Sequence, residues 1–151
     1  MYHAIVRSKV RKVFAALSAG DTGPMLHTLA PRFHYRFAGE HCLSGERTRH
    51  ADIAAWWGRV FRLFPGARFD VDEVVVSGPP WNTQVATHVQ LTARSAAGGD
   101  YGNEFVQLMR LRWGRATEVF TLEDTSRLER ELERMTAAGI AEAGAAAIVS
   151  H

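Results

Sequence analysis

The second half of the chain holds four apolar-rich segments joined by short turns of glycine and proline, and this pattern constrains the fold more than any other feature. Apolar and polar residues alternate within these segments, which is typical of β-strands with one buried face. Connections this short join antiparallel neighbours, because parallel strands need a crossover of a dozen or more residues. The sequence therefore predicts an antiparallel meander with strands at 67–76, 81–95, 102–113 and 116–122.

The first half is predicted to be mainly helical, because its apolar residues recur at three- and four-residue spacing. A first helix covers residues 2–17, and a short second helix begins near Pro24 and ends at Pro31. The alternating segment Phe33–Phe37 predicts a strand, and a hairpin-like excursion over 40–44 follows it. Further helices are expected over 48–64 and 125–138.

The expected element order is α-α-β-β-α-β-β-β-β-α, which defines the α+β class. We expect a strongly curved antiparallel sheet wrapped around the N-terminal helices in the shape of a cone. Side chains fill the closed end of such a cone, and its open end can hold a small molecule. One domain is predicted over residues 1–138, and the Ala-rich C-terminal tail 139–151 is expected to fray or to pack loosely.

Composition and motifs narrow the possible functions. The net charge of +2 does not indicate a protein that binds nucleic acid. The basic run Arg7–Lys12 is interpreted as a solvated helix face, and binding to an anionic surface or substrate is the alternative. The single cysteine, Cys42, is interpreted as a buried thiol rather than a nucleophile. No apolar run could span a membrane and no signal-peptide layout is present, so we expect a cytoplasmic protein without a membrane partner. We expect no metal, nucleotide or other cofactor, because phosphate-binding and metal-ligand motifs are missing.

Three segments carry a resemblance to a known family. Phe64–Val74 is similar to the family's passage from the third helix to the third strand, and Met109–Arg115 is similar to its last tight turn. Glu118–Thr125 is similar to its final strand, which often ends in an aspartate. Together they resemble the SnoaL-like and ketosteroid-isomerase-like proteins of the nuclear transport factor 2-like superfamily, which implies a cystatin-like α+β barrel over nearly the whole chain. Members include isomerases, dehydratases, polyketide cyclases, epoxide hydrolases and pure binding proteins, so the resemblance leaves the function open.

Asp124 lies between the last strand and the last helix and has two interpretations. By position it matches the aspartate that serves as general acid/base in SnoaL-like cyclases. That role needs an apolar cavity to raise its pKa, and Phe120 and Leu122 could form the wall. Alternatively, Asp124 caps the helix, because aspartate is favoured there and Ser126–Glu129 fits a capping box next door. A cap would lower the pKa instead.

The other candidates are assigned from their positions. His41 is the preferred partner of Asp124 in an acid/base dyad, with a surface-loop histidine as the alternative. Tyr35 lies near the position of the proton-transferring aspartate of ketosteroid-isomerase-like enzymes; it could donate to a substrate oxygen or be a core tyrosine. Gln107 matches their oxyanion-stabilising acid loosely and could donate its amide to an oxyanion. The apolar wall of the substrate site is assigned to Phe37, Trp57, Phe61, Met109 and Phe120, and the adjacent tryptophans equally suit a bulky core.

Two functions remain open. The first is a small cofactor-free enzyme that transfers protons on an apolar cyclic or polyketide-like substrate, as a cyclase, isomerase or dehydratase. The second is a non-catalytic protein on the same fold that binds a small ligand or acts as a scaffold, which the missing acid on the first strand favours. In either case we expect a homodimer through a mostly polar outer sheet face, formed by Gln84, His88, Gln90, Arg110 and Arg112.

Overall fold

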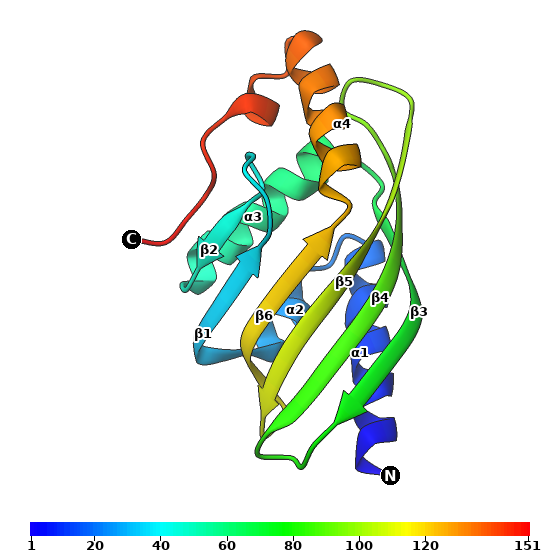
Figure 1. The fold of residues 1–151 in the computed structure, drawn as a ribbon, viewed down its shortest axis with the longest axis vertical. Coiled ribbons are helices and arrows are strands. Elements are labelled where there is room, and N and C mark those ends of the chain that lie inside the picture. The colour runs from blue at the N-terminus through cyan, green and yellow to red at the C-terminus, as the bar shows by residue number, and fades with distance from the viewer.

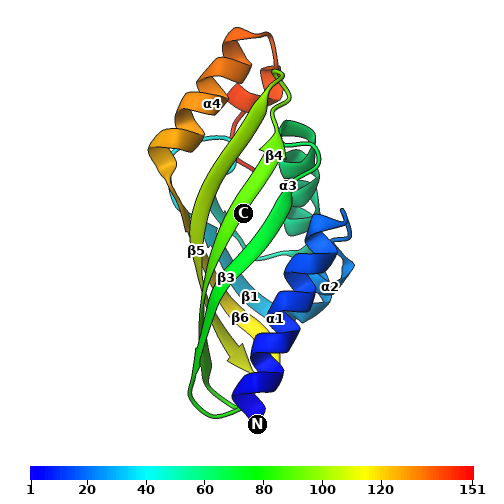
Figure 2. The ribbon, with the colours of Figure 1, turned by 90° about the vertical axis from the view of Figure 1, so that its right-hand side faces the viewer.

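The computed structural model describes all residues, Met1–His151, as a curved sheet with three helices on its concave side (Figures 1 and 2). The elements are α1 (Tyr2–Ser18), α2 (Gly23–Thr28), β1 (Leu29–Phe37), β2 (Gly45–Arg47), α3 (His50–Leu63), β3 (Arg68–Ser77), β4 (Thr83–Arg94), β5 (Asp100–Arg112), β6 (Arg115–Glu123), α4 (Thr125–Ala137) and a short 3-10 helix, η1 (Ala141–Gly144). This order confirms the predicted α+β class and the predicted succession of helices and strands.

The sheet has six strands in the order β2-β1-β6-β5-β4-β3. Strands β3 to β6 form the predicted antiparallel meander, whereas β1 pairs with β6 in parallel. The chain from β2 to β5 supplies the long crossover that a parallel pair requires. Because β2 and β3 are edges, the sheet stays open, and it curves around the helices as a cone rather than as a closed barrel.

The second helix is shorter than predicted. It ends at Thr28, and β1 begins at Leu29, so Pro31 lies inside a strand instead of ending a helix. The register of β1 on β6 shifts between Leu29 and His34, and such an irregularity accommodates a residue without a backbone N–H.

A β-bulge in β6 decides which of its side chains enter the core. Relative to β5, strand β6 contains one extra residue, Thr117, between Ala116 and Glu118. One extra residue moves every later side chain to the other face of the sheet. Phe120 and Leu122 therefore lie on the outer face, and their predicted inward direction is wrong. The inward residues after the bulge are Val119, Thr121 and Glu123.

The C-terminal tail folds back along α3 and β2 instead of fraying (Figure 1). Glu142 of η1 forms ion pairs with Arg59 at 3.3 Å and Arg62 at 2.6 Å. Arg47 of β2 is fully buried and donates hydrogen bonds to four backbone carbonyls, one of which belongs to Ile148. The expectation of a loose tail is wrong, because these bonds tie it to the domain.

One prediction about a single residue can be compared directly with the structure. Cys42 is buried, as predicted. No helix is both long enough and apolar enough to cross a membrane.

Candidate active site

A cavity of about 40 Å³ lies at the centre of the fold, between α1, α3 and the concave face of the sheet. Figure 2 shows this layering, with α1 and α3 on one side of the sheet. Most of the lining is apolar or aromatic, and its four polar members are Tyr35, Gln107, Thr121 and Glu123. An apolar lining with a few convergent polar groups is typical of a small-molecule site.

Glu123 is the only carboxylate in this lining, and its residue is 6% exposed. The Tyr101 hydroxyl and Asn103 Nδ2 each donate a hydrogen bond to Glu123 Oε2 at 3.1 Å. Burial disfavours the charged form more than these hydrogen bonds favour it, and it raises the pKa of Glu123 to about 7. A carboxyl that titrates near neutral pH can both accept and return a proton.

The two hydrogen-bond donors come from the inward positions of β5. Asn103 Nδ2 also lies 2.7 Å from Tyr101 Oη and 3.1 Å from the backbone carbonyl of Asp124. Burial and the nearby charge of Glu123 raise the pKa of Tyr101, so its hydroxyl keeps its proton and remains a donor. The network therefore fixes the orientation of the Glu123 carboxyl.

Tyr35 and Gln107 line the cavity from β1 and β5, and their predicted inward direction is confirmed. Gln107 Nε2 lies 3.4 Å from Thr121 Oγ1. Burial raises the pKa of Tyr35 although the charge of Arg47 opposes this, so Tyr35 can donate a hydrogen bond but cannot act as a base at neutral pH. Gln107 also borders a second cavity of about 90 Å³, which lies between α1, α2 and β5.

Asp124, the predicted acid/base, is a helix cap in the structure. Its Oδ1 accepts hydrogen bonds from the backbone N–H of Arg127 at 3.3 Å and from Ser126 Oγ at 3.1 Å, and its side chain is exposed. The hydrogen bonds lower the pKa of Asp124, which makes it a poor proton shuttle at neutral pH. The expectation of a carboxylate in an apolar cavity is therefore wrong for Asp124, because the register of β6 turns Glu123 inward instead.

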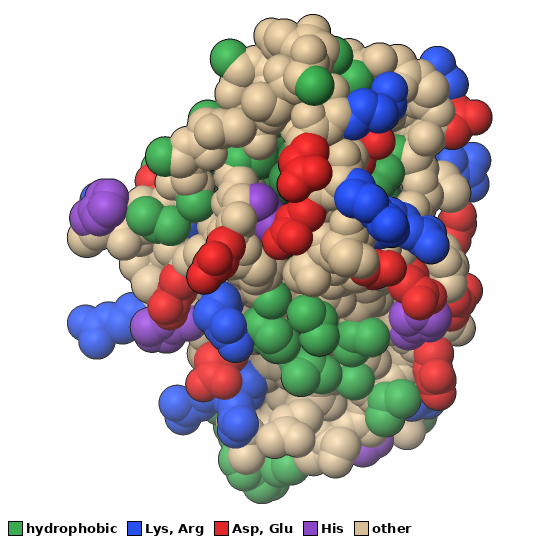
Figure 3. All heavy atoms as spheres, turned by 45° about the horizontal axis from the view of Figure 1, so that its top comes forward, with side chains coloured by type: hydrophobic (Ala, Val, Ile, Leu, Met, Phe, Trp, Pro, Cys, Tyr) green, Lys and Arg blue, Asp and Glu red, His purple; other side chains and the backbone are tan.

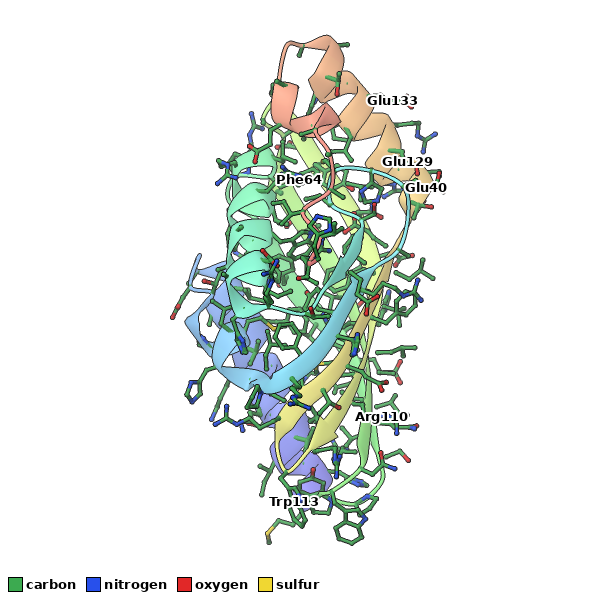
Figure 4. The ribbon with its side chains drawn as sticks, turned by 90° about the vertical axis from the view of Figure 1, so that its left-hand side faces the viewer. Glu40, Phe64, Arg110, Trp113, Glu129 and Glu133 are labelled. Atoms are coloured by element: carbon green, nitrogen blue, oxygen red, sulfur yellow. The ribbon has the colours of Figure 1, made fainter.

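His41 does not pair with Asp124, since no hydrogen bond or ion pair joins them. His41 Nδ1 accepts a hydrogen bond from the backbone N–H of Leu43 at 3.2 Å. Burial lowers the pKa of His41, so the ring is neutral at pH 7. His41 lines a separate groove beside α4, together with Glu40 and Glu129. Figure 4 shows these two glutamates close together near α4. The predicted dyad is wrong in its geometry.

The residues of the predicted apolar wall have different locations. Phe37 and Trp57 line the central cavity, whereas Met109 lines the second one. Phe61 packs on Trp57, with ring centroids 5.7 Å apart, and borders neither cavity. Phe120 lies on the outer face, where the guanidinium of a neighbouring arginine covers its ring at 4.2 Å. The assignments of Phe61 and Phe120 to the wall are therefore wrong.

The sequence interpretation missed Glu123 together with its partners Tyr101 and Asn103. A signal for the partners exists, because they continue the inward alternation of Phe105 and Gln107 along β5. The structure contains no group of three or more His, Cys, Asp or Glu side chains placed to hold a metal ion.

Comparison with known proteins identifies the family. A model of the SnoaL-like domain matches residues 10–119, and the chain belongs to this family. An NTF2-like protein of unknown function from Burkholderia pseudomallei has a TM-score of 0.73 and 22% identity, over 82% of this chain and 94% of that one. TerC, co-crystallised with polyporic acid, has a TM-score of 0.71 and 20% identity, over 83% and 96%. IdmH from Streptomyces antibioticus, named as a candidate polyketide cyclase, has a TM-score of 0.68 and 18% identity, over 84% and 97%.

These solved structures share the fold, and identities at this level show the fold alone. A search of curated proteins gives no match. The predicted family and its cone-shaped fold are thus confirmed, whereas the chemistry must be inferred from the cavity.

Proposed function

We propose that this protein is a small cytoplasmic enzyme that transfers protons on an apolar cyclic or polyketide-like substrate, as a cyclase, isomerase or dehydratase. The proposal depends on one observation, which is that a carboxyl with a pKa of about 7 lines an otherwise apolar central cavity. The names of two relatives support the substrate class, since one was crystallised with polyporic acid and another is a candidate polyketide cyclase.

The polar groups of the cavity divide the chemistry between them. The Glu123 carboxylate takes a proton from a carbon next to a substrate carbonyl and later returns it to another substrate atom. Negative charge develops on the carbonyl oxygen, and the Tyr35 hydroxyl and the Gln107 amide are the donors available to stabilise it. Tyr101 and Asn103 hold the carboxyl in place during both transfers.

The volume of the cavity sets a condition on substrate binding. About 40 Å³ holds one or two water molecules, so a cyclic substrate binds only when the lining side chains move apart. Phe14 and Gln107 border both the central cavity and the 90 Å³ cavity beside α1. Rotation of the Phe14 ring would join the two spaces, which makes α1 the wall most suited to open.

The small volume favours the second candidate function, a non-catalytic protein that binds a small ligand or acts as a scaffold. On this alternative Glu123 is a structural group, because its hydrogen bonds to Tyr101 and Asn103 link the ends of β5 and β6. The aromatic side chains around it then form an ordinary packed core.

Proton exchange distinguishes the two functions. Hydroxyquinones that keep a ring C–H next to a carbonyl, such as 2-hydroxy-1,4-naphthoquinone, and polyketide-like phenols, incubated in heavy water, report removal of that proton by NMR. We expect the wild type to catalyse this exchange and Glu123→Gln to lose at least about 100-fold in rate. Asp124→Asn, the matched control, should keep the wild-type rate. Equal rates in the wild type and Glu123→Gln would show that Glu123 is not the acid/base.

We also propose that the protein forms a homodimer through the outer face of the sheet. Val106, Leu108 and Leu122 are 42%, 49% and 50% exposed there, beside Phe120. Figure 3 shows a patch of hydrophobic side chains surrounded by charged ones. A contiguous exposed apolar patch is characteristic of a protein interaction site. The proposed interface has an apolar centre with a polar border, whereas the sequence indicates a mostly polar one.

A further inference from the structure

The end of the molecule that carries the N-terminus in Figure 1 exposes two tryptophans that the proposed chemistry does not use. Trp81, between β3 and β4, is 56% exposed, and Trp113, between β5 and β6, is 70% exposed. Their ring centroids are 5.9 Å apart, and the backbone N–H of Trp113 donates a hydrogen bond to the backbone carbonyl of Pro80 at 2.7 Å. The two turns therefore form one unit, here called the tip, and Figure 4 shows Trp113 at this extremity.

Trp113 has a backbone conformation that its residue type disfavours. Its φ is 51°, that of Gly114 is 78°, and Arg112 pairs directly with Arg115 across the turn. Two consecutive positive φ angles in a two-residue hairpin turn define type I′, for which Asn-Gly is the preferred sequence. A bulky residue at positive φ is an outlier, and the only aromatic ring that the 70% exposed Trp113 ring packs against is that of Trp81, which is itself exposed. Such strain points to a role outside the fold.

The charge around the tip is mainly positive. Arg112 and Arg115 are exposed on either side of the turn, and a Cβ on Gly114 would lie 3.7 Å from Lys9 Nζ of α1. Residues 1–20 and 105–117 together contain seven Lys and Arg and no Asp or Glu, and one of the seven, Arg110, forms an ion pair with Glu118 at 3.5 Å. Since the whole chain has a net charge of only +2, its remaining segments have an excess of acids. The positive charge is thus concentrated at the tip and along α1.

One further apolar side chain belongs to the tip. Ile5 of α1 is 57% exposed and borders the same cavity as Gly114, which places it next to the β5–β6 turn. Two indoles and an aliphatic side chain are therefore presented together, with cations around them.

We propose that this tip binds the surface of anionic lipid membranes. Tryptophan favours the boundary between headgroups and hydrocarbon, and each Lys or Arg near an anionic leaflet adds attraction. The proposal departs from the expectation of no membrane partner, which rests on the lack of a spanning segment and a signal peptide, because peripheral binding needs neither. An anionic surface is the alternative interpretation of the basic run on α1. The proposal is independent of any chemistry at Glu123.

The shape of the tip favours a lipid surface over other anionic partners. A convex end with three apolar side chains offers much less area than a stable protein–protein interface buries. The rings of Trp81 and Trp113 pack against each other at 45°, which leaves no slot between them for a nucleic acid base.

Vesicle flotation of the full chain tests the proposal, with phosphatidylcholine vesicles compared with vesicles that also contain phosphatidylglycerol. We expect binding to the anionic vesicles only, a blue shift of tryptophan emission, and weaker binding at high salt. Trp113→Asn should reduce binding at least about tenfold while the melting temperature stays the same or rises, because Asn-Gly suits the turn. Arg112→Gln should reduce binding about fivefold.

Arg68→Gln is the matched control for the charge change, because Arg68 is exposed at the start of β3 and lies outside the tip. It should leave vesicle binding unchanged. Unchanged binding of Trp113→Asn, or equal binding to neutral and anionic vesicles, would overturn the proposal. Binding to single-stranded DNA without binding to vesicles would overturn it in favour of a nucleic acid partner.

Discussion

The carboxyl groups of Glu123 and Asp124 are consecutive in the chain and have opposite surroundings. Glu123 is buried among Tyr101, Asn103 and aromatic rings, and its pKa is raised to about 7. Asp124 is exposed, caps α4 and has a lowered pKa. The strand ends and the helix begins between them, so one side chain enters the core and the other points to solvent. Changing either carboxyl to an amide should therefore give contrasting results.

Glu123 should make the protein less stable as the pH rises towards neutral. Its pKa is about 7 in the folded protein and 4.5 as a free side chain, so between these values the folded state holds a proton that the unfolded chain has released. The free energy of unfolding should fall by about 3 kcal/mol between pH 4.5 and pH 7. Urea unfolding across this range checks the slope, which Glu123→Gln should abolish. A wild-type stability that does not decrease across this window contradicts the raised pKa.

Asp124 should show the reverse dependence on pH. Its pKa is lowered in the folded protein, so its contribution to stability is present above its ordinary pKa of 3.8 and is lost as the pH falls below that value. Asp124→Asn keeps a good cap and should unfold in urea much like the wild type at pH 7. Asp124→Ala removes the cap and should be less stable than Asp124→Asn in the same measurement. Equal stability of the two variants would show that the cap contributes nothing.

Arg47 should hold the C-terminal tail in place. Burial lowers its pKa to about 10, so it remains charged at neutral pH while it donates to four carbonyls. Arg47→Met leaves these acceptors without a donor and should cost about 3 kcal/mol in urea unfolding. Amide hydrogen exchange should also quicken at Ser150, whose N–H donates to the Glu46 carbonyl at 3.1 Å. Arg68→Gln serves as the control, and an unchanged exchange rate in Arg47→Met would contradict the prediction.

Phe14 should separate the two interior cavities. The ring is 3% exposed and borders both, so Phe14→Ala should join them at a cost of about 4 kcal/mol in stability. The enlarged apolar space should bind a small aromatic molecule such as indole, detected as a rise in melting temperature with indole concentration. Phe61→Ala, which truncates a ring outside both cavities, should show no such rise. A response to indole in both variants, or in neither, would contradict this arrangement.

The sequence was sufficient to predict the fold because strand alternation and glycine turns act over short distances. The late strands 81–95 and 102–113 were predicted to within two residues of β4 and β5 at either end. The same reasoning failed in β6, because the extra residue Thr117 is an ordinary strand residue and nothing in its type indicates a bulge. That one residue reversed the predicted direction of Phe120 and Leu122 and turned Glu123 into the core.

The tail illustrates a second limit of sequence analysis. An Ala- and Gly-rich segment indicates weak packing, and the contacts of Ala143 and Ile148 are made largely through a small side chain and a backbone carbonyl. Every residue has a backbone carbonyl, so the sequence of the tail does not indicate that a buried arginine donates hydrogen bonds to it. Its partner, Arg47, is an unremarkable charge in the sequence until the structure shows that it is buried.

Leu108 should contribute to a dimer interface on the outer face of the sheet. It is 49% exposed in β5, beside Val106, so a glutamate there is tolerated by the fold and places a charge at the centre of the apolar patch. We expect the wild type to sediment as a dimer at micromolar concentration and Leu108→Glu as a monomer with an unchanged circular dichroism spectrum. Trp113→Asn, which removes an exposed ring at the tip, should remain dimeric. A buried unpaired charge costs several kcal/mol, so a Leu108→Glu variant that still dimerises would exclude this face as the interface. A monomeric wild type would exclude it as well.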